Sequence, residues 1–217
     1  MEEVEIHSWR DFLLHYKLLF ITVFTGIFFG VVLFLGWNYY QEYQSVTRNK
    51  SSTVFSRASQ IDEVNSKEIQ ELLLQNLDIF DNDSSSAYPI FARLLIAKTY
   101  FEQNKIDEAI KSYQWILDNN NNNYFLWVTK IRLSKLFQNI NKIPEAIEIL
   151  SEASSKEPPP NGLKELVENE LGNCYYQSGN IDKAKAFWQS AFNLSKSKDK
   201  KIFYQIKIDN AISNLAN

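Results

Sequence analysis

Residues 104–110 read NKIDEAI, residues 141–147 read NKIPEAI, and residues 179–184 read GNIDKA. Each stretch contains one alanine, and successive alanines are 37 and then 38 residues apart. A repeat of this length is typical of stacked helix pairs, in which each pair buries its apolar face against the next. The sequence therefore predicts an all-α fold, a right-handed superhelix of antiparallel helix pairs.

Other residue types recur at fixed distances from each alanine. A small residue lies twelve positions before it, an aromatic residue nine positions before it, and a large apolar residue four positions after it. These are Ala97, Tyr100 and Tyr113 in the first repeat, Ser134, Phe137 and Leu150 in the second, and Gly172, Tyr175 and Trp188 in the third. Any antiparallel bundle has apolar residues three to four positions apart, but shared landmarks in three copies favour the tetratricopeptide (TPR) pattern, L-G-x-x-Y followed by A-x-x-x-F.

Local signals place the ends of the helices in each repeat. Asp107, Pro144 and Asp182 suit the first turn of a helix, because a carboxylate there meets the positive end of the dipole and a proline loses no hydrogen bond. Residues 119–123 are asparagines that predict a polar loop, and the prolines at 158–160 end the preceding helix.

The array occupies only part of the chain. We expect a short N-terminal tail at 1–17, a transmembrane helix with an aromatic end at 18–40, and a linker helix with a divergent helical pair at 41–86. Three TPR-like repeats and a C-terminal capping helix then occupy 87–217.

The membrane segment is predicted from residues 18–37, LLFITVFTGIFFGVVLFLGW, which carry no charge. Twenty helical residues span about 30 Å, the thickness of a bilayer core. A cleaved signal peptide and a buried core helix are the alternatives. The apolar run is longer than a signal core, and it ends in an aromatic belt at 36–40, GWNYY, which favours a retained single-pass helix.

The flanking charges leave the orientation of this helix open, because basic residues lie on both sides of it. Within the helix, Thr22, Gly26 and Gly30 form a small-residue face that could contact another membrane helix and support a homo-oligomer. Ordinary use of glycine in membrane helices is the alternative interpretation.

Composition argues against several classes of function. Both histidines, His7 and His15, precede residue 18, so the body of the chain has no histidine to act as a base or metal ligand. Cys174 is the single cysteine, and we expect a buried structural thiol. A net charge of −3 argues against nucleic-acid binding. No phosphate-binding glycine motif occurs, and the pairs Asp62–Glu63 and Asp81–Asp83 lie in polar stretches expected to be solvated. We expect no enzyme activity, catalytic residue, cofactor or metal.

A TPR array holds ligands on the concave face lined by the first helix of each repeat. We expect twelve residues to line this groove: Phe91, Leu94, Lys98, Phe101, Val128, Ile131, Lys135, Gln138, Leu166, Asn169, Asn173 and Tyr176. This mixture suits an extended or helical peptide better than a nucleotide. Two lysines fall short of the dense basic clamp expected for reading a C-terminal carboxylate. A solvated groove without a ligand of its own is the alternative.

The whole chain resembles the YfgM family, the ancillary subunits of the bacterial SecYEG translocon. The resemblance rests on the order of four groups of residues: Gly36-Trp37-x-Tyr39-Tyr40; Leu133-Ser134 with Ile143-Pro144-Glu145-Ala146; Leu171-Gly172 with Gly179-Asn180-x-x-Lys183-Ala184-x-x-x-Trp188; and Ile206-Lys207-Ile208-Asp209-Asn210.

This resemblance implies a bacterial inner-membrane protein with a cytoplasmic N-terminus and a periplasmic repeat domain. The implied partners are the SecYEG translocon, a membrane-anchored periplasmic prolyl-isomerase-like chaperone and newly exported client proteins. Two alternatives share the fold: a membrane-anchored TPR scaffold for assembling another envelope or respiratory complex, and a regulator of envelope stress signalling.

Overall fold

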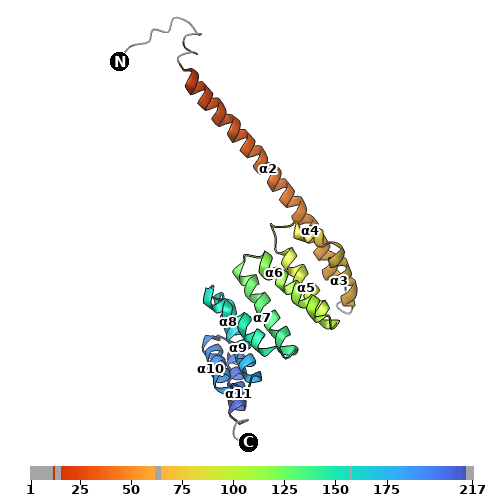
Figure 1. The fold of residues 1–217 in the computed structure, drawn as a ribbon, viewed down its shortest axis with the longest axis vertical. Coiled ribbons are helices and arrows are strands. Elements are labelled where there is room, and N and C mark those ends of the chain that lie inside the picture. The colour runs from red at the N-terminus through yellow and green to blue at the C-terminus, as the bar shows by residue number, and fades with distance from the viewer. Residues whose placement is uncertain (1–11, 13–15, 62–64, 157, 214–217) are drawn as a thin grey trace, which may run out of the picture.

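The computed structural model describes residue 12 and residues 16–61, 65–156 and 158–213. This part of the chain contains helices and no strand. The helices are α2 (Lys17–Gln60), α3 (Ser66–Gln75), α4 (Leu77–Asp81), α5 (Tyr88–Glu102), α6 (Ile106–Asn119), α7 (Asn123–Asn139), α8 (Ile143–Lys156), α9 (Asn161–Gln177), α10 (Ile181–Leu194) and α11 (Lys198–Ser213). The predicted all-α class is confirmed, and the pairs α5–α6, α7–α8 and α9–α10 follow one another away from α2 (Figure 1).

Helix α2 is one continuous helix of 44 residues, and its two parts have different surroundings. Its N-terminal part projects from the array as a rod (Figure 1), and no residue of its most apolar window is buried by the rest of the described chain. Its C-terminal part carries a buried stripe at three- and four-residue spacing, formed by Gln44, Thr47, Ser51, Val54 and Ala58. No glycine or proline occurs at 37–60, so nothing in the sequence interrupts the helix between the two parts.

The C-terminal part of α2 shares a hydrophobic core with α3, α4 and α5. Val54 and Ala58 pack in one cluster with Leu73, Phe80 and Ile96. Two polar contacts reinforce this junction. The Gln44 side-chain amide donates to Ser84 Oγ at 3.1 Å, and the Ser51 hydroxyl donates to the Ile79 carbonyl at 3.4 Å. The projecting helix is therefore built into the first layer of the array.

Asp83 is buried at the same junction, so the expectation that it is solvated is wrong. Burial raises its pKa, but hydrogen bonds from the hydroxyls of Ser86 and Ser85, together with the nearby hydroxyl of Ser51, outweigh burial, and the net pKa lies below the ordinary value. The carboxylate organises the turn before α5, since it also accepts the backbone N–H of Ser85 at 3.1 Å. Asp62 and Glu63 lie outside the described residues.

The recurring Asn or Gly between paired helices has a backbone cause. Asn104, Asn141 and Gly179 have φ values of 59°, 60° and 80°, which place them in the left-handed region. The next residue in each repeat donates its N–H to the carbonyl of the aromatic landmark five positions earlier, at 2.8 to 2.9 Å. This is the Schellman ending of a helix, which favours Gly and then Asn at the left-handed position. The turn chemistry therefore explains why the stretches quoted first begin with Asn or Gly.

The alanine landmarks lie where paired helices cross. Ala109, Ala146 and Ala184 are completely buried, as are Ala97 and Ser134 at the facing small-residue position. In the third repeat that position is Gly172, where an added Cβ would lie 2.4 Å from Trp188 Cδ1. The small residues therefore permit the close approach of the two helices in each pair.

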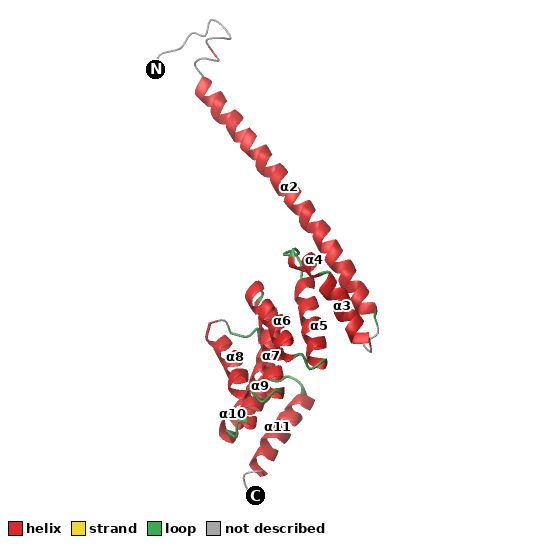
Figure 2. Cartoon of the chain, turned by 45° about the vertical axis from the view of Figure 1, so that its right-hand side comes forward, coloured by secondary structure: helices red, strands yellow, loops and turns green. Residues whose placement is uncertain are grey.

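The last helix, α11, closes the array at the end opposite α2 (Figure 2). Ile208 and Ala211 pack with Ala184 and Trp188 of α10 in one apolar cluster. Tyr204 and Lys200 reach across to α9, where the Tyr204 hydroxyl donates to Glu165 Oε1 at 2.8 Å and Lys200 Nζ lies 3.0 Å from the same oxygen. This helix covers the apolar face that the third repeat would otherwise expose.

Candidate functional site

The twelve predicted groove residues divide between the surface and the core. Leu94 and Ile131 are buried in the clusters between helices, so neither offers a surface to a partner. Val128 is half-buried against the same clusters. The exposed members are Phe91, Lys98, Phe101, Lys135, Leu166 and Tyr176, and the partly exposed ones are Gln138, Asn169 and Asn173.

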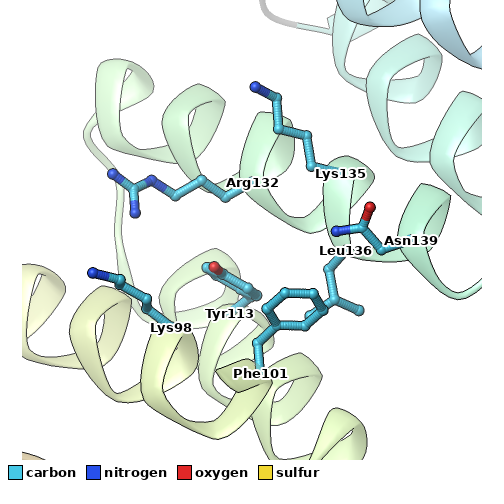
Figure 3. A pocket seen from close by; sticks show the side chains of 7 residues that line it. All are labelled: Lys98, Phe101, Tyr113, Arg132, Lys135, Leu136 and Asn139. Atoms are coloured by element: carbon cyan, nitrogen blue, oxygen red, sulfur yellow. The ribbon is translucent and has the colours of Figure 1, made fainter. Parts of the chain in front are cut away.

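Three of these residues meet in one hollow between the first two repeats. Lys98 and Phe101 come from α5, and Lys135 comes from α7. Tyr113 of α6 and three further residues of α7 complete the lining; these are Arg132, Leu136 and Asn139. Figure 3 shows Tyr113 between Lys98 and Arg132, with Phe101 beside Leu136. The hollow measures about 180 Å³, below the range of roughly 300–1,000 Å³ that encloses a drug-sized ligand.

The lining of this hollow is cationic on one side and apolar on the other. It includes Lys98, Arg132 and Lys135, and none of its seven residues is acidic. Arg132 and Tyr113 both line the hollow, and the charge of Arg132 acts on the hydroxyl of Tyr113. Burial raises the pKa of Tyr113, and the charge of Arg132 only partly offsets that effect, so the hydroxyl stays protonated at neutral pH. We call this group of seven residues the cationic pocket.

Further along the array, the chain's own side chains fill the predicted groove. Glu170 of α9 is only 5% exposed, and it accepts hydrogen bonds from Gln138, Asn169 and Asn173 at 3.2 to 3.4 Å. Lys207 of α11 donates to Asn169 Oδ1 at 2.8 Å and to Asn173 Oδ1 at 2.7 Å. These side chains hydrogen-bond one another, so the groove near α9 has fewer polar atoms available to a ligand than the cationic pocket has.

Burial of this network also shifts a pKa. Burial lowers the pKa of Lys207, the nearby carboxylate of Glu170 raises it, the charge of Lys135 lowers it, and the net shift is downward. The ammonium group also lies 5.3 Å from the ring centre of Trp188. Lys207 therefore ties α11 to both helices of the third repeat.

Sequence reasoning missed four lining residues of the pocket: Tyr113, Arg132, Leu136 and Asn139. The predicted stripe on α7 ran through Val128, Ile131, Lys135 and Gln138, whereas the open stripe runs through Arg132, Lys135 and Asn139. Both stripes have helical spacing and share Lys135, and they differ by one position at 131 and 138. The charge at 132 beside the isoleucine at 131 was the available signal, because an apolar residue next to a charged one more often faces the core.

Within the described residues, no other part of the chain lies against the two glycines of the membrane-helix face. An added Cβ at Gly26 or Gly30 would meet nothing within 4 Å among the described residues. The Thr22 hydroxyl donates to the Leu19 carbonyl at 2.9 Å, which satisfies it inside the helix. A contact between this face and a second helix stays a prediction.

Cys174 is buried, as expected, and its chemistry is that of a structural thiol. Burial, together with the nearby charge of Glu170, raises the pKa of the thiol to about 12. In the part of the chain that the structure covers, no group of three or more His, Cys, Asp or Glu residues is placed to hold a metal ion. His7 and His15 lie outside the described residues.

We expect the Cys174 thiol of the folded protein to react with a disulfide reagent at pH 8 roughly a thousandfold or more slowly than an ordinary cysteine, because so little of it is thiolate. The reaction can be followed by the absorbance of the released thiol. Cys174 is the single cysteine, so the denatured chain provides the control. Equal rates for folded and denatured protein would contradict the burial seen here.

The stacked helix pairs, the left-handed turns inside each pair and the small residues at the helix crossings define a tetratricopeptide-repeat-like protein. The chain belongs to the family described as tetratricopeptide repeat-like domain, whose sequence model matches residues 15–213. It is similar to the ancillary SecYEG translocon subunit of Buchnera aphidicola subsp. Schizaphis graminum (strain Sg), with 28% identity over 149 residues, which cover 69% of this chain and 73% of that protein. The resemblance to ancillary translocon subunits is thereby confirmed.

Solved structures agree on the fold. Pseudomonas aeruginosa pilF is 17% identical, with a TM-score of 0.54 over 81% of this chain and 70% of that one. The MamA RS-1 double mutant is 12% identical, with a TM-score of 0.54 over 81% of this chain and 86% of its own. At these identities the likeness concerns the helix-pair architecture alone.

Proposed function

We propose that this protein is a membrane-anchored ancillary subunit of the SecYEG translocon that acts through protein–protein contacts and catalyses no reaction. The observation that carries the proposal is the similarity to the translocon subunit from Buchnera aphidicola, which extends over 149 residues. The fold supports it, because TPR arrays present extended surfaces for partner segments. The long α2 supports it as well, since its apolar part is unpacked while its other end is built into the array.

The finer parts of the proposal concern topology and partners. We place the N-terminal tail in the cytoplasm and the repeats in the periplasm, with residues 18–37 as the single span of the inner membrane. We also propose that the repeats work with a membrane-anchored periplasmic prolyl-isomerase-like chaperone on newly exported proteins. The family resemblance supports these partners, and the rigid junction at Gln44 and Ser51 would hold the array close to the membrane.

Co-purification tests the proposed partner directly. The full chain, tagged and extracted from bacterial membranes in mild detergent, is expected to bring down the translocon core and a membrane-anchored periplasmic chaperone, identified by mass spectrometry. Recovery of an unrelated envelope or respiratory assembly without translocon subunits would overturn the proposal in favour of a general scaffold. A reporter that is active only in the periplasm, fused after Asn217, is expected to be active, and an inactive but stable fusion would overturn the topology.

A matched pair of variants tests whether the membrane helix makes the contact with the translocon. Gly26→Leu with Gly30→Leu fills the small-residue face, and Ile27→Leu with Val31→Leu changes the neighbouring face while keeping the helix apolar. If the Gly26/Gly30 variant fails to recover the translocon while the Ile27/Val31 variant still recovers it, the small-residue face makes the contact. If the two variants recover the translocon equally, the repeats make the contact.

A further inference from the structure

The cationic pocket differs in charge from the rest of the chain. The protein has 26 acidic and 23 basic residues, yet the pocket lining contains three basic residues and no acidic one. Exposed lysines scattered over a surface are ordinary, but here the three basic residues come from two helices and surround one hollow. The local charge therefore favours an anionic group in the hollow.

The three cations are available to a ligand to different degrees. Lys98 Nζ lies 3.8 Å from Glu102 Oε1 on the same helix, and both side chains are exposed. Ion pairs between exposed side chains add little stabilising free energy, so Lys98 is available to a ligand. No ion pair with Arg132 occurs among the described residues. Lys135 lies 3.2 Å from Glu170 with its side chain 56% exposed. Because Glu170 also accepts three amide hydrogen bonds, it keeps partners when Lys135 turns toward a ligand.

The pocket also offers the geometry that a carboxylate needs. Arg132 carries a planar guanidinium, which can donate two parallel hydrogen bonds to one carboxylate. Phe101 is exposed beside the buried Leu136, and its ring provides an apolar surface near the charges, on which a short methylene chain can lie.

From this geometry we propose that the cationic pocket binds the side chain of a glutamate within an extended peptide segment of a partner protein. The carboxylate pairs with Arg132 and with Lys98 or Lys135, and the glutamate methylenes lie on Phe101. The hollow of about 180 Å³ accepts one side chain, and the peptide backbone runs along the open face between α5 and α7. The inference deepens the proposed function, on which it rests for the protein nature of the partner.

Selection of displayed peptides tests the proposal with the purified full chain in detergent. Short random peptides are displayed as internal segments, so that none ends in a free carboxylate. Peptides retained by the natural chain are expected to be enriched in a glutamate beside apolar residues. Arg132→Gln is expected to lose these peptides, whereas Lys111→Gln, an exposed lysine of α6 outside the pocket, is expected to keep them.

The best peptide then gives a quantitative test by fluorescence anisotropy. Changing its glutamate to glutamine is expected to weaken binding by about tenfold or more, and Arg132→Gln in the protein is expected to do the same, because each removes a charge-assisted hydrogen bond. Affinity is expected to fall as salt is added. Circular dichroism of each variant confirms that it is folded.

Several results would overturn the proposal. These are no selected peptide, selected peptides without acidic enrichment, and equal loss of affinity with Arg132→Gln and Lys111→Gln. If a free C-terminal carboxylate restores binding of the peptide that carries glutamine in place of glutamate, the pocket binds the C-terminal ends of chains and not glutamate side chains. Full competition by inorganic phosphate at the peptide's own concentration would show a general anion site. The assay contains no translocon, so its failure is distinct from a failed co-purification.

Discussion

Replacing Trp127 by alanine is expected to lower the free energy of unfolding of the array by about 3–5 kcal/mol. The side chain is 1% exposed, and it lies in the cluster that joins α7, α8 and α9. Removing the indole leaves a cavity in this cluster, and the helices around it pack against further helices of the array, so they cannot close it fully. Urea denaturation of the full chain in mild detergent, followed by circular dichroism, measures the effect.

Tyr124→Ala is the matched control for Trp127→Ala. Tyr124 lies on the same helix three positions earlier, but it is 49% exposed. We expect its loss to change the unfolding free energy by about 0.5 kcal/mol, as is usual at a surface. Similar shifts of the urea midpoint for the two variants would contradict the packing described here.

Replacing Gly172 by alanine is expected to destabilise the third repeat by about 1–3 kcal/mol. The new methyl group would lie 2.4 Å from Trp188 Cδ1 and 2.5 Å from Nε1. The indole cannot easily move away, because it is buried and its N–H donates to Asn173 Oδ1 at 3.2 Å. Alanine is a better helix former than glycine by about 1 kcal/mol, so the steric cost is expected to exceed that gain.

Gly162→Ala isolates the steric part of that effect. Gly162 is on the same helix, and an added Cβ there meets nothing within 4 Å. We expect this variant to be neutral or up to about 1 kcal/mol more stable. A double-mutant cycle with Trp188→Leu completes the test, because the second repeat has leucine, Leu150, at the position equivalent to Trp188 and the small residue Ser134 at the position equivalent to Gly172. Gly172→Ala is expected to cost less in that background, and additive effects would count against a clash with Trp188.

Features set by local backbone chemistry were predictable from the sequence. Asn104, Asn141 and Gly179 begin the shared stretches from which the repeat was predicted, and the structure gives the reason for their recurrence, because a left-handed helix ending favours such residues. The small residues and the alanines followed from the need of paired helices to approach closely. The apolar run at 18–37 was equally clear, because bilayer thickness sets its length.

Features that depend on how helices rotate against one another were harder to predict. The buried stripe of α2 begins at Gln44 within one unbroken helix, and no residue type marks where the free rod meets the array. Asp83 lies in a polar stretch, and Ser85 and Ser86 of the same loop hydrogen-bond its carboxylate, but it is buried where α2 packs beside this loop. The packing of α2 there is a contact between residues distant in the sequence, as the Gln44–Ser84 hydrogen bond shows.

The sequence by itself determined the repeat architecture and the apolar helix, because periodicity and hydropathy are local properties. Only the tertiary structure decided which flank of each helix is open. Ile131 turns into the core while Arg132 joins Lys98 and Lys135 around one hollow. Lys207 of the last helix fills the groove beside Asn173. The physical reason is that a rotation of about 100° separates adjacent helical positions, and packing against neighbouring helices fixes that rotation.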